Sequence, residues 1–159
     1  MARLDDRDAG YLRRALALAR EAREEGNAPF GAVLVGGDGR VLAEGKNTVT
    51  TQKDPTAHAE TNLVRDAFGT VDAETFASAT LYSSAEPCAM CSGAIFWGGV
   101  GRVVYGLGAD RIYEMFPPDE GRPVVRLPCR EVMAAGTRRT EIVGPALEDE
   151  AEGVFGGLT

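Results

Sequence analysis

The sequence lacks the features that would send the chain out of the cell or into a membrane. Its first residues mix both signs of charge, from Arg3 to Asp8, where a signal peptide needs an apolar run. No stretch approaches the ~20 consecutive apolar residues of a transmembrane helix. The cysteines number only three, an odd count, so a disulfide framework is not expected and the thiols should be reduced. These absences predict a cytoplasmic protein with no membrane partner.

Basic residues are scarce relative to acidic ones. Lysine and arginine number 17 against 24 aspartates and glutamates, a formal net charge of -7, and the sequence pI is about 4.8. Proteins that bind nucleic acids usually carry a basic stripe that displaces counterions from phosphates. The composition therefore argues against a nucleic-acid partner and favours a small, roughly neutral substrate. The length of 159 residues, with 44% hydrophobic and 26% charged residues, predicts a single domain over residues 1–159.

The chain does contain a regular alternation of helix and strand patterns, marked by apolar periodicity and glycine breaks. The Gly36–Gly39 segment predicts a hairpin between the first two strands. Such alternation predicts an α/β fold, a three-layer sandwich with a mixed five-stranded sheet, mostly parallel beyond its antiparallel hairpin, and helices on both faces. Helices are expected over Asp6–Glu25, Ala57–Phe68, Cys88–Trp97, Ala109–Met115 and Arg130–Ala135, with an acidic helix ending near Phe155; strands over Phe30–Val35, Arg40–Glu44, Thr80–Ser83, Arg102–Tyr105 and Glu141–Val143; a polar loop over Asn47–Thr56; and a short apolar piece over Val124–Leu127.

Two short motifs stand at the starts of two predicted helices: His58-Ala59-Glu60 and Pro87-Cys88-Ala89-Met90-Cys91. His58 is the only histidine in the chain. Cys88 and Cys91 are three residues apart, so they share one face of a helix, and the positive end of the helix favours their thiolate form. With His58 they make three ligands of mixed nitrogen and sulfur type, which leave a tetrahedral zinc ion one open position. Catalytic zinc sites are built in this way.

Glu60 gains a role from this arrangement. It follows the predicted ligand His58 by two residues, so the two side chains can converge only at a helix end. Water in the open position of the ion is acidified towards a pKa of about 7. Glu60 can then accept a proton, pass it to a ring nitrogen and later protonate departing ammonia, which is general acid–base catalysis.

Two other interpretations of the cysteines stay open at this point. A Cys-x-x-Cys pair that opens a helix is also the pattern of thioredoxin-like redox sites, although the lone histidine on the other helix start disfavours it. A structural zinc site would add Cys129 as a fourth ligand and would make the protein a zinc-stabilised interaction module. Cys129 could equally be a small buried hydrophobic residue. Glu86, which precedes Pro87, either orients a neighbouring loop or is solvated.

His-x-Glu followed by Pro-Cys-x-x-Cys is the signature of zinc nucleobase deaminases. The chain resembles the cytidine deaminase-like superfamily from its first helix to the strand over Arg102–Tyr105. Within the superfamily, the segments Asn47-Thr48-Val49-Thr50-Thr51 and Asp54-Pro55-Thr56-Ala57-His58-Ala59-Glu60 are most similar to bacterial guanine deaminases. The tRNA adenosine deaminases and the cytosine deaminases share the same core.

The resemblance implies Zn²⁺ on His58, Cys88 and Cys91, with Glu60 as the proton shuttle. It implies hydrolytic release of ammonia from a small nucleobase or nucleoside, guanine first, with cytosine, adenine, triazines or pterins as alternatives. A tRNA substrate is disfavoured by the acidic charge. A homodimer is implied, and the tail over about 145–159 is expected to pack on the active site or on a partner subunit. The candidate substrate contacts are Asn47, Ala59, Phe30 and Trp97.

Overall fold

The computed structural model describes residues 3–157 of the chain. Its helices and strands follow the predicted order, with two additional short helices, α2 and α4. The elements are α1 (Asp6–Glu24), β1 (Gly31–Val35), β2 (Val41–Lys46), α2 (Val49–Gln52), α3 (Ala59–Phe68), α4 (Ala73–Ser78), β3 (Thr80–Ala85), α5 (Ala89–Gly98), β4 (Arg102–Leu107), α6 (Ala109–Met115), α7 (Cys129–Ala134), β5 (Glu141–Val143) and α8 (Glu148–Gly153).

The five strands form one mixed sheet in the order β2-β1-β3-β4-β5. The predicted hairpin is confirmed: β1 pairs antiparallel with β2. However, β1 also pairs antiparallel with β3, while β3–β4 and β4–β5 are parallel. Only half of the neighbouring pairs are therefore parallel, and the expectation that the sheet beyond the hairpin is mostly parallel holds for β3, β4 and β5 alone.

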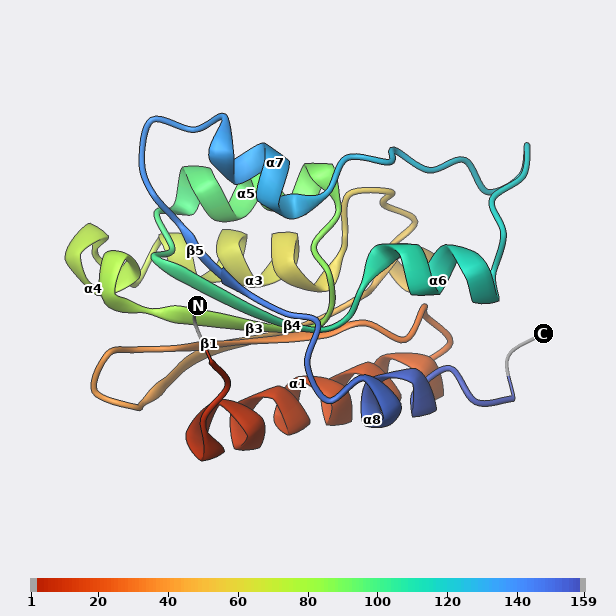
Figure 1. Ribbon diagram of the computed structural model, residues 1–159, viewed down its shortest axis with the longest axis horizontal. Helices are drawn as coiled ribbons and strands as arrows, with labels where there is room; N and C mark the ends of the chain where they lie inside the picture. The colour runs from red at the N-terminus through yellow and green to blue at the C-terminus, as the bar shows by residue number, and fades with distance from the viewer. Residues whose placement is uncertain (1–2, 158–159) are drawn as a thin grey trace.

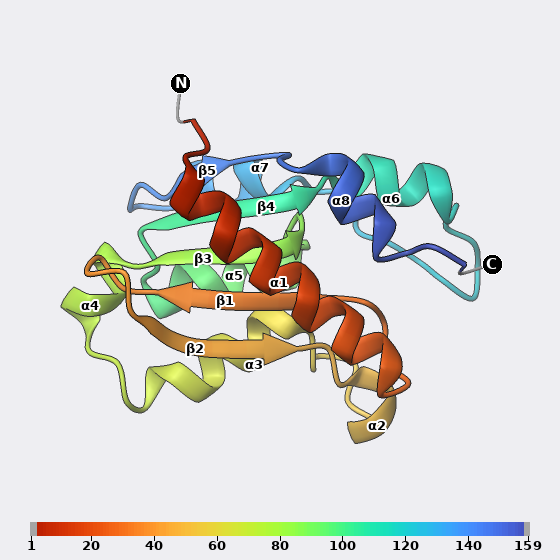
Figure 2. The same ribbon diagram turned by 90° about the horizontal axis from the view of Figure 1, so that it is seen from below.

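Helices cover both faces of the sheet, which confirms the predicted α/β fold (Figure 1). The first helix, α1, and the last, α8, lie on one face, and α3, α5 and α7 lie on the other. Figure 2 shows the first face, where α1 crosses the strands diagonally. All five residues of β1 are buried between the two helical layers. Strands covered on both faces lose their polar alternation, which explains the continuous apolar run of β1.

The first helix shows how the sequence builds these layers. Asp5 and Asp8 form a reciprocal capping box that satisfies free backbone N–H groups at the start of α1. The buried positions recur at helical spacing, so that one stripe of the helix faces the sheet. They include Leu12, Ala15 and Ala19, each fully buried. Gly26, in a left-handed conformation, follows the end of the helix.

The two unpredicted helices are short. α2 lies inside the segment expected to be a polar loop, and α4 follows the turn after α3. Helices of four and six residues are too brief to show an apolar period, so the pattern that revealed the longer helices could not reveal them. α4 does carry a local start signal, because the Asp72 carboxylate accepts a hydrogen bond of 2.7 Å from the Thr75 N–H.

A close approach of backbones sets the position of α3 on the sheet. A methyl group on Gly45 in β2 would collide with the carbonyl oxygen of Ala59 and would lie 2.9 Å from Leu63 Cβ. Only glycine lets the first turn of α3 lie this near to the strand. The start of α3, where His58 and Glu60 stand, is therefore fixed against the edge of the sheet.

Across residues 3–157, no helix has the length and apolar character needed to cross a membrane.

Candidate active site

The starts of α3 and α5 bring three predicted metal ligands together. His58 is the N-cap residue of α3 and Cys88 is the N-cap residue of α5, both with extended backbone. The two helices pack against each other on one face of the sheet. His58 Nδ1 lies 3.6 Å from Cys88 Sγ and 3.5 Å from Cys91 Sγ. All three candidate ligand atoms lie within 4.8 Å of one another.

These distances fit a zinc ion. A tetrahedral ion with bonds of about 2.3 Å to sulfur and about 2.0 Å to nitrogen holds those two ligand atoms roughly 3.5 Å apart. Both observed nitrogen–sulfur distances, 3.5 and 3.6 Å, agree with that separation. The donor set also matches, because one imidazole and two thiols are ligands that zinc prefers. Three protein ligands leave one tetrahedral position for solvent or substrate.

The thiols are electrostatically prepared for a cation. A hydrogen bond from the Cys91 thiol, together with His58, lowers the pKa of Cys88 to about 4 despite its burial. Donating that hydrogen bond, along with burial, raises the pKa of Cys91. Without metal, Cys88 is therefore a thiolate and Cys91 keeps its proton. A divalent cation would displace that proton, because metals bind the thiolate form.

The alternative interpretations of the cysteines do not match the structure. Cys88 and Cys91 are both free thiols, and both sulfurs converge on His58 Nδ1 as metal ligands do, which a dithiol redox pair does not require. Cys129 is buried at the start of α7 and, within residues 3–157, is not among the residues grouped as a possible metal site. A four-ligand structural zinc site would need it there. Cys129 instead fills the core as a small hydrophobic residue.

Glu60 lies beside the trio but outside the ligand set. It is only 6% exposed, on the first turn of α3. Burial, followed by the charge of Cys88, raises the pKa of its carboxyl group to about 7. A carboxyl group with a pKa near neutrality can both take up and release a proton at physiological pH.

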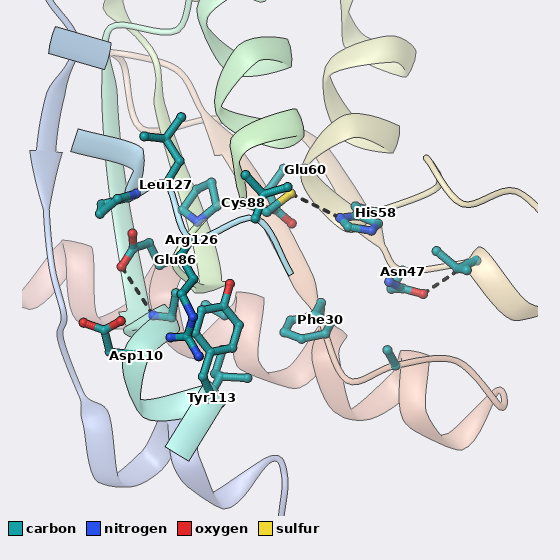
Figure 3. A pocket seen from close by; sticks show the side chains of 18 of the residues that line it. Phe30, Asn47, His58, Glu60, Glu86, Cys88, Asp110, Tyr113, Arg126 and Leu127 are labelled. Carbon is teal, nitrogen blue, oxygen red and sulfur yellow. Dashed lines mark hydrogen bonds between the residues drawn. The ribbon is translucent and has the colours of Figure 1, made fainter. Parts of the chain in front are cut away.

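His58, Glu60 and Cys88 line one cavity of about 440 Å³ (Figure 3). The cavity lies at the carboxyl ends of β3 and β4, the usual place for ligands in open α/β sheets. Apart from the groups already described, its walls come from the segment before β1, the start of α2, the end of β3, α6 and the segment before α7. Its lining residues are Ala28, Phe30, Asn47, Val49, Thr50, His58, Glu60, Ala85, Glu86, Pro87, Cys88, Ala109, Asp110, Ile112, Tyr113, Val125, Arg126, Leu127 and Pro128.

The four predicted substrate contacts are divided by the structure. Asn47 and Phe30 line the cavity, whereas Ala59 is fully buried outside the lining and Trp97 points away, with 81% of the residue exposed. The Asn47 Oδ1 atom accepts a hydrogen bond of 3.1 Å from the Val49 N–H. This bond turns the amide nitrogen of Asn47 towards the side of the cavity where His58 lies (Figure 3). Asn47 therefore offers a hydrogen-bond donor to whatever enters.

Sequence reasoning did not identify the wall opposite His58. Tyr113 on α6 and Arg126 on the segment before α7 face each other there, and the guanidinium carbon lies 5.0 Å from the ring centroid (Figure 3). The only earlier signal was the short apolar piece over Val124–Leu127, whose place in the fold depends on tertiary packing. Its apolar members Val125 and Leu127 are 66% and 41% exposed.

Glu86 orients this wall, the first of the two roles considered for it. Its carboxylate accepts hydrogen bonds of 3.3 Å from the Ala109 N–H and 3.1 Å from the Cys129 N–H. These are the first residues of α6 and α7. One carboxylate at the end of β3 therefore holds the starts of both helices. The chain between these two starts carries Arg126 and is fixed at both of its ends.

The C-terminal helix supports the cavity from behind. Phe155 packs on Phe30 and on Phe116, with ring centroids 5.8 Å apart in both pairs. Arg111 on α6 forms a two-pronged ion pair with Glu152 on α8. The part of the tail over residues 145–157 thus lies against this chain's own cavity wall; residues 158 and 159 are outside the described part.

Residues 5–107 match the family described as the cytidine and deoxycytidylate deaminase zinc-binding region. A probable cytosine deaminase of Schizosaccharomyces pombe is 38% identical over 93% of this chain and 90% of that protein. The guanine deaminase of Bacillus subtilis is 48% identical over 60% of this chain and 61% of that protein. A solved guanine deaminase from Nitrosomonas europaea is 25% identical, with a TM-score of 0.74, over 97% of this chain and 84% of that chain.

The fold and the site define a zinc-dependent deaminase, a hydrolase that acts on C–N bonds. The chain belongs to the cytidine and deoxycytidylate deaminase family, whose zinc-binding region covers both of its motifs.

Proposed function

We propose that this enzyme removes the amino group of a free nucleobase, with guanine as the preferred substrate. The observation that carries the proposal is the position of the buried Glu60 carboxyl group, in one cavity with His58 and Cys88. The acidic net charge of -7 favours a small substrate over a polyanionic RNA. Relatives that are guanine deaminases support the choice of base.

In this proposal His58, Cys88 and Cys91 hold the zinc ion. Zinc, when bound, supplies the Lewis acidity that makes water a nucleophile near neutral pH. Glu60 takes the proton of the attacking water and delivers it to the ring nitrogen beside the amino-bearing carbon. The same carboxylate then takes the proton of the hydroxyl group newly added to that carbon and passes it to the departing amine, which leaves as ammonia while the carbonyl forms. A pKa of about 7 suits a group that must gain and lose a proton in each cycle.

Phe30 and Asn47 are proposed to orient the base. Phe30 offers an aromatic face for stacking, and Phe155 behind it holds the ring in place. The Asn47 amide nitrogen can donate to an acceptor of the base, because its oxygen is already engaged by the Val49 N–H. Fixing the amide in advance lowers the cost of ordering it when substrate binds.

Cytosine is the second candidate. The probable cytosine deaminase of Schizosaccharomyces pombe matches 93% of this chain and 90% of its own length. Both bases carry an amino group on a carbon next to a ring nitrogen, so the same catalytic groups could act on either. Discrimination between them must come from the cavity wall away from His58.

A panel of ammonia-release assays tests the proposal. Guanine, cytosine, adenine, a pterin, an aminotriazine and the corresponding nucleosides would be compared by kcat/KM with zinc-loaded enzyme. We expect guanine to give the highest value. A higher value for cytosine would reverse the order, and no ammonia from any compound would refute the proposal. The Glu60→Gln variant, purified in the same way, controls for contaminating deaminases.

We also propose that the enzyme works as a homodimer in the cytoplasm. Two large apolar residues near the ends of neighbouring helices are exposed: Phe68 on α3 by 64% and Trp97 on α5 by 81%. Exposed apolar side chains of this size often mark an interface. Sedimentation of the wild type should give twice the chain mass, and Trp97→Glu should give a single chain mass. A monomeric wild type at micromolar concentration would refute the dimer.

A further inference from the structure

One arginine in the active-site cavity has no hydrogen-bond or ion-pair partner among residues 3–157. Among the described residues that line it, Arg126 is the only lysine or arginine. Within residues 3–157 it forms no salt bridge, although nearby arginines such as Arg111 and Arg130 are engaged by a carboxylate or by oxygen atoms. Its guanidinium stacks on Tyr113, at 5.0 Å from the ring centroid. Stacking restrains the plane of the guanidinium but leaves its N–H groups available.

The position of Arg126 makes it relevant to the bound base. Figure 3 shows Arg126 and Tyr113 on one side of the cavity, and His58 and Asn47 on the other. A substrate whose amino-bearing carbon faces the His58–Cys88–Cys91 trio would turn its opposite edge towards Arg126. Arg126 is therefore placed to contact the part of the base that is not attacked. Groups at this edge can decide which base is accepted without changing the chemistry.

Guanine and cytosine differ strongly at that edge. In guanine the amino-bearing carbon is C2, and the opposite edge presents two acceptors, O6 and N7. In cytosine the amino-bearing carbon is C4, and the atom opposite to it is N1, which carries a hydrogen. A guanidinium has N–H donors in a planar fork, matches a pair of acceptors, and has no acceptor for an N–H.

We propose that Arg126 is a specificity-determining residue that reads the O6 and N7 atoms of guanine and disfavours cytosine. The inference rests on the proposed function and deepens it, since it explains how a catalytic centre suited to both bases selects one. Tyr113 keeps the guanidinium in the plane of the base edge. Glu86 holds both ends of the segment that carries it, through Ala109 and Cys129.

The test compares two bases that differ at one atom. 7-Deazaguanine keeps the 2-amino group and O6 but replaces N7 with a C–H group. For the wild type we expect kcat/KM to fall at least about fivefold from guanine to 7-deazaguanine. In Arg126→Met the kcat/KM values for guanine and 7-deazaguanine should agree within about twofold, because the side chain no longer has an N–H group that could bind N7. A two-pronged contact of this kind is worth about 1–3 kcal/mol, so Arg126→Met should lower kcat/KM for guanine by between about fivefold and 150-fold.

Further arms separate a geometric role from a general one. Arg126→Lys keeps the positive charge but lacks the planar pair of N–H donors. Its kcat/KM for guanine should therefore be close to that of Arg126→Met and well below that of the wild type. For cytosine, Arg126→Met should raise kcat/KM rather than lower it, because the N–H donors of the guanidinium no longer face the N1–H group of the base. Hypoxanthine, which has O6 and N7 but no amino group, should inhibit the wild type better than 7-deazahypoxanthine does. The two compounds should inhibit Arg126→Met equally well. That readout requires binding and no turnover.

The matched control is Arg122→Met, which removes the same charge from the same segment at a residue outside the cavity lining. It should keep kcat/KM for guanine within about twofold, and thermal unfolding would verify that both variants fold. Equal losses for guanine and cytosine in Arg126→Met, or a 7-deazaguanine penalty that persists there, would overturn the role of Arg126 while the proposed function stands. A wild type that releases no ammonia from guanine would overturn both.

Discussion

Two buried carboxyl groups, Asp8 and Glu60, lie at different places in the molecule and have opposite surroundings. Asp8 is 4% exposed and Glu60 is 6% exposed, so the exposed surface alone does not separate them. Burial acts to raise the pKa of both groups. What differs is the number of hydrogen-bond donors that each carboxylate meets. The comparison shows how one chain uses the same functional group for structure and for chemistry.

Asp8, at the start of α1, is fully satisfied. Its carboxylate accepts a hydrogen bond of 2.7 Å from the Tyr82 hydroxyl and a two-pronged pair of 2.7 and 2.9 Å from Arg102. The Asp5 N–H donates to it as well. Burial raises the pKa of Asp8, but these donors outweigh burial and lower it to about 2. The charge is thus stabilised, and it ties α1 to β3 and β4.

Glu60 has the opposite balance. Burial and the negative charge of Cys88 together outweigh the groups that favour its ionised form, and its pKa rises to about 7. A carboxylate held by donors cannot exchange its proton near neutral pH, whereas one with few donors can. We therefore expect Asp8 to serve the fold and Glu60 to serve the proposed reaction. The following variants test that division.

The largest effect is expected from Glu60→Gln. Removing the proton carrier should lower kcat by about 10²–10⁴-fold, the usual contribution of general acid–base catalysis. Folding stability should not fall, because an amide is less costly to bury than an unsatisfied carboxylate. Steady-state kinetics and chemical denaturation measure the two quantities. Near-normal turnover would remove Glu60 from the mechanism.

Bound zinc distinguishes this variant from a damaged metal site. Glu60→Gln should keep about one zinc per chain, since Glu60 lies outside the ligand set. Cys91→Ala should lose most of its zinc together with activity, because two protein ligands hold the ion poorly. Full zinc content in Cys91→Ala would refute the ligand assignment.

A smaller effect, on stability alone, is expected from Asp8→Asn. The substitution leaves Arg102 without its main partner and should lower the free energy of unfolding by about 2–4 kcal/mol. Activity per folded molecule should stay within about twofold of the wild type. Denaturation midpoints and ammonia release, measured on the same sample, check both statements. A stable but inactive variant would contradict the division.

The pH dependence of stability sharpens this prediction. The folded-state pKa of Asp8, about 2, lies below its ordinary value of 3.8, so the unfolded chain takes up the proton first as pH falls. The stabilisation is present above pH ~4 and is lost between pH ~4 and pH ~2. The stability gap between the wild type and Asp8→Asn should therefore shrink by about 2 kcal/mol across that window. A constant gap would mean that Asp8 stabilises the fold by packing alone.

The sequence allowed the catalytic trio to be predicted because its information is local. His58 and Cys88 are each the N-cap of a helix, and the turn chemistry around each can be read from a few residues. The layers of the fold were predictable for a similar reason: the stripe of α1 and the run of β1 are periodic patterns. The periodic patterns needed no knowledge of which distant segments meet, whereas the meeting of the two motifs, 30 residues apart, was implied by the resemblance to zinc deaminases.

The remaining parts depend on such meetings. Arg126 and Tyr113 are 13 residues apart in sequence and meet at the cavity, where Glu86 also ties the starts of α6 and α7 to the end of β3. Trp97 was expected in the cavity as an aromatic of α5, but the rotation of that helix turns it outward. No local pattern specifies either outcome, because each is decided by packing between elements.

The absence of a side chain at Gly45 has a consequence for how this enzyme can vary. The carbonyl that presses on Gly45 belongs to Ala59, the residue between His58 and Glu60. One added methyl group there would push both functional side chains away from the sheet without touching either, and displacements of about 1 Å can cost a hundredfold in rate. The absence of a side chain at Gly45 on β2 thus controls where the first turn of α3 lies. A substitution of Gly45 would therefore lower activity although His58, Glu60, Cys88 and Cys91 are all still present.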